Sequence, residues 1–78
     1  MSLTRFKRRL DTIRVILRHL ERSPCQWTPL MKHVLRHSTP WLAQSCLDWL
    51  LAEEYLERPF RGSYQLSQKG LALLRAIE

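Results

Sequence analysis

The 78-residue sequence lacks the features that mark most enzymes and membrane proteins. It shows no paired carboxylates, no nucleophile–base set and no phosphate-binding loop, so we expect no enzyme, no bound cofactor and no small-molecule substrate. No apolar run approaches the roughly 20 residues that a membrane span needs. The basic N-terminus is followed by no continuous apolar region, which argues against a secretion signal. These absences predict a cytoplasmic protein that does not enter a membrane.

Cysteine is also scarce. Cys25 and Cys46 stand 21 residues apart and form no CxxC pair, and a single disulfide is not expected in a cytoplasmic protein. His33 and His37 have the i, i+4 spacing of some zinc ligands. Together with the two cysteines they would make a set of four potential zinc ligands. This spacing matches no structural zinc pattern, so we expect ordinary surface histidines and no metal.

Acidic residues are few, and the charge is unevenly distributed. Thirteen Lys and Arg against seven acids give a net charge of +6 and a pI near 10.2. Residues 1–39 carry a net charge of +7, whereas residues 40–78 carry −1. Ten of the thirteen cations are Arg, whose planar guanidinium suits phosphate better than a point charge does. The first half therefore predicts a surface that faces a polyanion, although a basic face that only keeps the protein soluble has the same composition.

A single domain is expected over residues 1–78, because no repeat, low-complexity tract or linker divides the chain. Its core is small, so stability should be modest unless the protein dimerises. Residues 1–4 are expected to be frayed. From Arg5 to about Arg22, apolar residues recur at steps of three and four, which predicts a long amphipathic helix. A membrane-surface helix is the alternative, and the mixed charges of its polar face disfavour it.

Two shorter helices are expected next. Thr28-Pro29 opens the first and Ser38-Thr39-Pro40 opens the second, since a hydroxyl can cap free amides and proline suits the first helical position. Only about four residues separate the helices, as in a helix-turn-helix. An ordinary pair of packed helices is the alternative.

The second of these helices, over residues 38–54, has two different faces. One face is apolar and is expected to lie in the core; it holds Leu42, Ala43, Cys46, Leu47 and Leu50. The opposite face carries Trp41, Gln44, Ser45, Asp48 and Ala52. That second face is available to a partner.

After Glu54 the spacing of apolar residues changes from a helical pattern to an alternating one. Residues 55–58 and 63–66 are short alternating runs, and the segment 59–62 between them contains Gly62, so a β-hairpin is expected. Upstream, Trp27 is expected either in a short strand or as a staple onto the following helix. Ser67 can cap a last helix. Gly70 lies in the first turn of this helix and is expected to reduce its stability slightly.

Two passages make the sequence resemble a known family. The passage from Leu47 to Leu56 (LDWLLAEEYL) is similar to the end of a recognition helix and the first wing strand of winged helix-turn-helix proteins. The passage from Tyr64 to Gly70 (YQLSQKG) is similar to the second wing strand and the start of the last helix. The segment from Arg8 to Ile13 fits a generic first helix. The resemblance covers nearly the whole chain and is closest to small archaeal regulators, including those of archaeal viruses and plasmids.

This resemblance implies an α+β fold, mainly α, in the order helix, helix, helix, hairpin wing, helix. It implies a nucleoid-associated transcription regulator, in which a recognition helix over residues 39–54 enters the major groove of double-stranded DNA. A wing over residues 58–63 would contact the backbone or the minor groove. Glu54 stands where the family usually has glycine. Many relatives dimerise through a long C-terminal helix; this chain ends at Glu78, so that route is reduced and a homodimer stays open.

The expected DNA contacts come from four places. They are Trp41, Gln44 and Ser45 on the recognition helix, Lys32, Arg36 and His37 near the joint, Arg58 and Arg61 on the wing, and Arg5, Lys7, Arg8 and Arg9 near the start of the chain. Gln44 suits an adenine edge, and Asp48 either accepts a hydrogen bond from cytosine or points away. Because this helix face has no Lys or Arg, affinity must come from phosphate contacts elsewhere.

Two other functions are consistent with the same residues. A protein-docking domain would use Trp41, Trp49 and Phe60 as an apolar patch. RNA binding through the basic surface is the other alternative, because charge does not distinguish the two nucleic acids.

Overall fold

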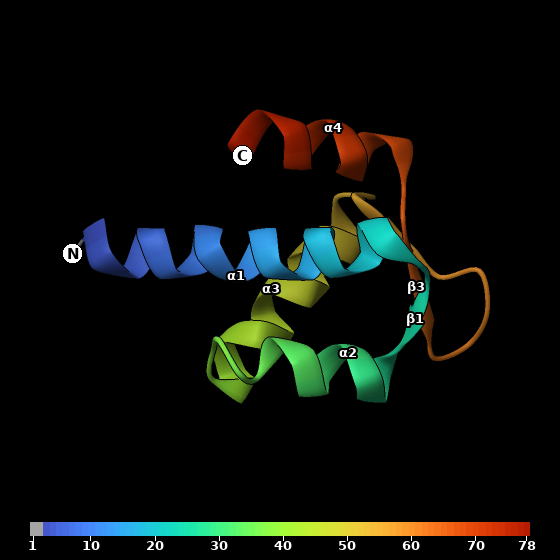
Figure 1. Cartoon of the computed structure of the whole chain (residues 1–78), viewed down its shortest axis with the longest axis horizontal. Helices are drawn as coiled ribbons and strands as arrows, with labels where there is room; N and C mark the ends of the chain where they lie inside the picture. Colours follow the sequence, from blue (N-terminus) through green and yellow to red (C-terminus); the bar gives the residue numbers. More distant parts are fainter. Residues whose placement is uncertain (1–2) are drawn as a thin grey trace.

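Four helices and three short strands make up the described part of the computed structural model (Figure 1). The structure describes residues 3–78, and side chains from Arg8 onward. The elements are α1 (Leu3–Arg22), β1 (Cys25–Gln26), α2 (Trp27–Val34), α3 (Pro40–Ala52), β2 (Leu56–Glu57), β3 (Ser63–Leu66) and α4 (Gln68–Ile77). The fold is therefore α+β and mainly α, as expected. No helix in this described part is both long and apolar enough to cross a membrane.

The long helix α1 lies between α2 and α4 in Figure 1 and contacts all three other helices. On its apolar stripe, Ile13, Leu17 and Leu20 are buried and Leu10 is half-buried. Burial of this stripe stabilises the helix far more than its intrinsic propensity does. The helix begins at Leu3 rather than at Arg5.

The core is one cluster to which every helix and the sheet contribute. Its largest fully buried members are Ile16, Leu17, Leu30, Val34, Leu47, Leu50 and Leu74. On α3, the residues at the expected buried positions are buried or, for Leu42, half-buried. The predicted core face of α3 is thus confirmed, whereas on the opposite face Trp41, Asp48 and Ala52 are exposed but Gln44 and Ser45 are half-buried.

Of the three helices with an expected cap, two begin as predicted. Thr39 caps α3, its hydroxyl accepting from the Leu42 amide at 3.3 Å, and Pro40 takes the first helical position. Ser67 caps α4 by accepting from the Gly70 amide at 2.9 Å. The expectation for α2 is wrong: this helix begins at Trp27, and the Gln26 side chain makes no capping bond.

The sheet adds a short strand, β1, to the expected hairpin; a strand was expected here only as one alternative for Trp27, which instead is the first residue of α2. β3 is the central strand, with β1 and β2 antiparallel on its two sides. Cys25 pairs with Tyr64, and Leu56 pairs with Leu66. Trp27 directly follows β1, and its amide donates to the Gly62 carbonyl at 2.9 Å. This bond ties the hairpin turn to the start of α2.

α3 ends at Ala52, two residues before Glu54. The Tyr55 amide donates to the Leu50 carbonyl and the Glu54 amide to the Leu51 carbonyl, which is the Schellman pattern. Glu54 has φ 65°, the left-handed conformation that favours glycine. The helix therefore ends where the family resemblance places a glycine, but with a glutamate in the strained conformation.

Gly70 corrects a second expectation. It is buried, and a Cβ at this position would overlap the carbonyl oxygen of Tyr55 and lie 2.8 Å from Leu66 Cδ1. A side chain does not fit there. Gly70 is thus required by the close approach of α4 to the chain that leaves α3, rather than being a mild cost in a helix.

Candidate nucleic-acid interface

The exposed face of α3 is polar and aromatic and carries no cation of its own. Trp41, in its first turn, is 81% exposed. One turn later, the Gln44 side-chain amide donates to a carboxylate oxygen of Asp48, with 2.8 Å between Nε2 and Oδ1. These two side chains are hydrogen-bonded neighbours at i, i+4 on the outer surface of the helix.

Ser45 is only half-buried, and its hydroxyl already has a partner. Arg9 of α1 donates from Nη1 to Ser45 Oγ at 3.2 Å. The two residues are 36 positions apart in the sequence, so no local pattern could have revealed the pair. The structure therefore brings a guanidinium group to the side of α3, which the sequence of that helix lacks.

Cys46, the next residue, lies in the core beneath this contact. Its thiol is fully buried, and burial raises the pKa of Cys46, while the charge of Arg9 acts in the opposite direction. A thiol with a raised pKa is a poor nucleophile and a poor metal ligand.

Two hydroxyl groups fix the turn between α2 and α3 against α1. Thr12 is buried and donates to the Arg8 carbonyl at 2.9 Å; its oxygen lies 2.8 Å from Ser38 Oγ. Because the Thr12 hydrogen is used on Arg8, Ser38 is the donor in the second bond. The start of α3 is thus held at a fixed distance from α1.

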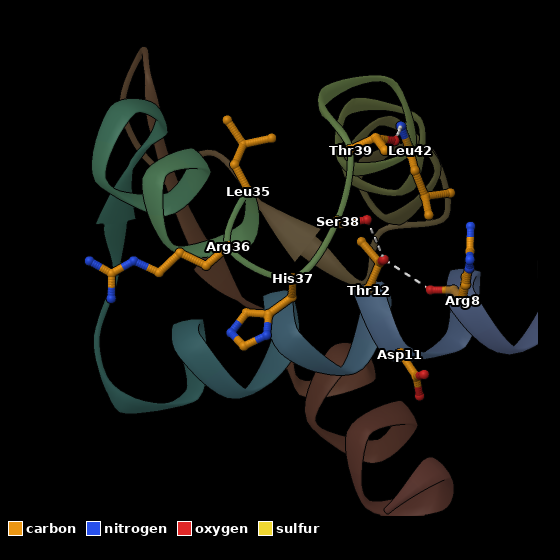
Figure 2. Close-up of a pocket in the computed structure, with 9 residues that line it drawn as sticks. All are labelled: Arg8, Asp11, Thr12, Leu35, Arg36, His37, Ser38, Thr39 and Leu42. Carbon is orange, nitrogen blue, oxygen red and sulfur yellow. Dashed lines mark hydrogen bonds between the residues drawn. The ribbon is translucent and has the colours of Figure 1, made fainter.

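An open cleft of about 480 Å³ lies beside these hydroxyls (Figure 2). Its lining residues are Arg8, Asp11, Thr12, Leu35, Arg36, His37, Ser38, Thr39 and Leu42. Figure 2 shows Arg8 beside Leu42 at one side, whereas the Arg36 guanidinium points away from the cleft at the other side. The cations border the cleft without converging on one point, which suits an extended chain of phosphates better than a single anion.

The hairpin turn carries two further arginines. Arg61 is exposed, and Phe60 beside it is 76% exposed. The Arg58 guanidinium lies over the Tyr64 ring, 5.6 Å from its centroid. Gly62 has φ 78°, so it supplies the positive φ that the turn requires. Arg61 is the freer of the two arginines because nothing in the described part of the chain pairs with it.

The remaining predicted contacts divide into two groups. Lys32, Arg36 and His37 are exposed on α2 and the turn after it. The side chains of Arg5 and Lys7 lie outside the described residues. The candidate interface, as the structure defines it, consists of the α3 face, Arg8 and Arg9 of α1, the turn and the hairpin.

The histidines form a cluster that the sequence only partly suggested. The rings of His19 and His33 stack at 4.3 Å, and His33 meets His37 at 5.6 Å. Cys25 Sγ lies 3.5 Å from His19 Nε2, while Cys46 is in the core. Among the described residues, no group of three or more potential ligands is arranged to hold a metal ion.

His33 lies between His19 and His37 in this cluster. Burial lowers the pKa of His33 below 6.5, and the nearby charges of His19 and His37, followed by Arg36 and Arg22, lower it further. The imidazole of His33 is therefore harder to protonate than that of an ordinary histidine.

No protein-family model, curated protein or solved structure matches the chain.

Proposed function

We propose that the chain is a winged helix-turn-helix domain that binds double-stranded DNA as a transcription regulator. In this proposal α3 enters the major groove, and the β2–β3 hairpin is the wing. The observation that carries it is the order of α2, a short turn, α3 and a hairpin, with exposed or half-buried arginines on α1, on the turn and on the hairpin. A helix-turn-helix presents its second helix to DNA, and surrounding cations position it on the phosphates.

Arg9 supports this proposal because it compensates for the missing cations of α3. Its hydrogen bond to Ser45 places positive charge against the helix that would enter the groove. Arg8 and Arg36 add charge near the start of α3, and Arg61 adds charge on the hairpin. Binding would then depend mainly on phosphate contacts and would weaken steeply with salt.

The test is titration of a labelled duplex at several salt concentrations. We expect the logarithm of the binding constant to fall linearly with the logarithm of salt concentration, with a slope of about −0.9 for each phosphate contacted. Arg61→Ala should weaken binding and make the slope shallower by about one contact. Arg75→Ala, which removes an equal charge from an exposed position near the end of α4, is the matched control. A slope near zero would contradict DNA binding, and equal effects of the two variants would exclude the wing.

A protein-docking role is the second candidate, and the exposure of Trp41 and Phe60 favours it. Trp49 contributes less than expected, because its ring packs on Tyr55 at 5.3 Å and is only 37% exposed. Tight binding of a protein partner that added duplex leaves unchanged would support this role. Competition between duplex DNA and structured RNA separates the third alternative, RNA binding, from the first.

A further inference from the structure

We infer that the hydrogen-bonded pair Gln44–Asp48 makes α3 a reader of base edges that donate hydrogen bonds, and that Asp48 selects against guanine. The bases selected would be cytosine, through its N4 amine, and adenine, through its N6 amine. This inference rests on the proposed function and goes further by naming the class of bases read.

The pair fixes the orientation of the Gln44 amide. A carboxylate only accepts hydrogen bonds, so the atom of Gln44 that lies 2.8 Å from Asp48 Oδ1 is the nitrogen. The carbonyl oxygen of the Gln44 amide then points away from Asp48 and stays available as an acceptor. A glutamine without such a neighbour can turn either end toward a base; Gln44 has this choice restricted by Asp48.

The result is a surface rich in acceptors. The pair offers the Gln44 carbonyl oxygen and the Asp48 carboxylate, while one of the two amide hydrogens is already used. α3 has no Lys or Arg, the side chains that most often bind guanine. In the major groove guanine presents only the acceptors O6 and N7, which a carboxylate repels. Cytosine N4 and adenine N6 present donors, which it attracts.

Trp41 is placed to contact a base next to the one that Gln44 and Asp48 contact. It lies one turn before Gln44 on the same face, and its ring is 81% exposed. A broad apolar ring at this place fits the methyl group of thymine, which is the apolar feature of the major groove. The expected site therefore combines a cytosine or adenine with a nearby thymine.

Asp48 should have opposite effects on affinity and on specificity. Its negative charge opposes the phosphates and lowers binding to every duplex. Its acceptor oxygens lower binding most where guanine faces them. Removing only the charge should thus strengthen binding in general while the discrimination between bases weakens. A residue with a merely structural role would not produce this combination.

The experiment is selection of binding sites from random duplexes with the full chain and with Asp48→Asn. For the original chain we expect one position at which cytosine or adenine is enriched and guanine is depleted about tenfold. Asp48→Asn should reduce this depletion to about twofold or less and should bind an unselected duplex more tightly. Glu53→Gln, which removes an exposed acid just beyond α3, is the matched control and should keep the selected motif.

A second variant, Gln44→Met, keeps the length of the side chain but removes both polar atoms. It should lose the preference at the same position. An unchanged motif in Asp48→Asn, or guanine enrichment by the original chain at the Asp48-dependent position, would overturn the inference while DNA binding stands. Failure of the original chain to enrich any duplex would remove the inference and the proposed function together.

Discussion

The two ends of α3 are held by different means. At the carboxyl end, side chains of the segment Ser67–Gly70 form hydrogen bonds to backbone carbonyl groups of the residues that follow α3. The Ser67 hydroxyl lies 2.8 Å from the Glu54 carbonyl and 2.9 Å from that of Tyr55, and Lys69 Nζ donates to the Glu53 carbonyl at 2.7 Å. Gly70 lets the two backbones approach.

At the amino end the contacts are hydrogen bonds of hydroxyl groups. The Thr39 cap is exposed, and the Thr12–Ser38 bond connects the turn to α1 beside an open cleft. The carboxyl end of α3 is thus fixed by side-chain bonds to backbone carbonyls and by close backbone packing, and the amino end by the hydroxyls of Thr12, Ser38 and Thr39. The carboxyl end connects directly to the hairpin, whereas the amino end borders the open cleft.

The largest expected effect comes from Gly70→Ala. The new methyl group would overlap the Tyr55 carbonyl, which is backbone and cannot turn away. We expect a loss of about 3 kcal/mol in the free energy of unfolding, measured by chemical denaturation. Gly62→Ala is the control: no atom lies within 4 Å of its Cβ, so only the positive φ opposes it, at about 1 kcal/mol. Equal losses would show that the carboxyl end of α3 is not tightly packed.

The amino end is tested by Thr12→Val, which keeps the shape of the side chain and removes its hydroxyl. The Ser38 hydroxyl then loses its acceptor, and we expect the free energy of unfolding to fall by about 1 kcal/mol. Thr28→Val, at an exposed position, should have almost no effect. If the two variants unfold alike, the hydroxyl pair does not hold the turn.

A smaller gain in stability is expected from Glu54→Gly. Glycine adopts φ 65° without strain, whereas a side chain there costs about 1–2 kcal/mol. Part of this gain is offset by the greater freedom of glycine in the unfolded chain, so the midpoint of denaturation should rise by an amount equivalent to about 1 kcal/mol. Ala52→Gly, two residues earlier and within the helix, should lower stability by a similar amount. A loss in both variants would mean that the Glu54 side chain contributes more than its strain costs.

The smallest effect concerns pH. Because the pKa of His33 is lower in the folded protein than its ordinary value of 6.5, the unfolded chain binds this proton more readily. The stability that depends on neutral His33 is therefore present above pH 6.5 and is lost as the pH falls through the lower folded value. The melting temperature should decline with acidification in this window, and His33→Gln should reduce the decline. His33 contacts His37, so acid should loosen the amino side of α3 first.

Local patterns were sufficient to predict the helices. Steps of three and four gave the buried face of α1, and Thr39-Pro40 gave the start of α3, because both depend on neighbours in the sequence. The sequence left β1 open as one of two alternatives and did not give its bounds, because its two residues are a strand only through pairing with Ser63 and Tyr64 far along the chain.

The candidate site was predictable in composition but not in arrangement. Trp41 and Arg61 are exposed as expected, since the position of each on a helix or turn decides this. The contact of Arg9 with Ser45 depends on how α1 packs against α3, and the direction of Arg36 away from the cleft is not encoded in a local pattern. Gly70 was misjudged for the same reason: its need for space comes from a carbonyl group of another segment.

The burial of Cys46 has a practical consequence for following the molecule in solution. Its thiol is enclosed by the core and has a raised pKa, whereas Cys25 is only half-buried. A thiol-specific reagent will therefore modify Cys25 in the native protein and reach Cys46 only when α3 separates from α1. The rate of the second modification measures how often the core opens, without any change to the sequence.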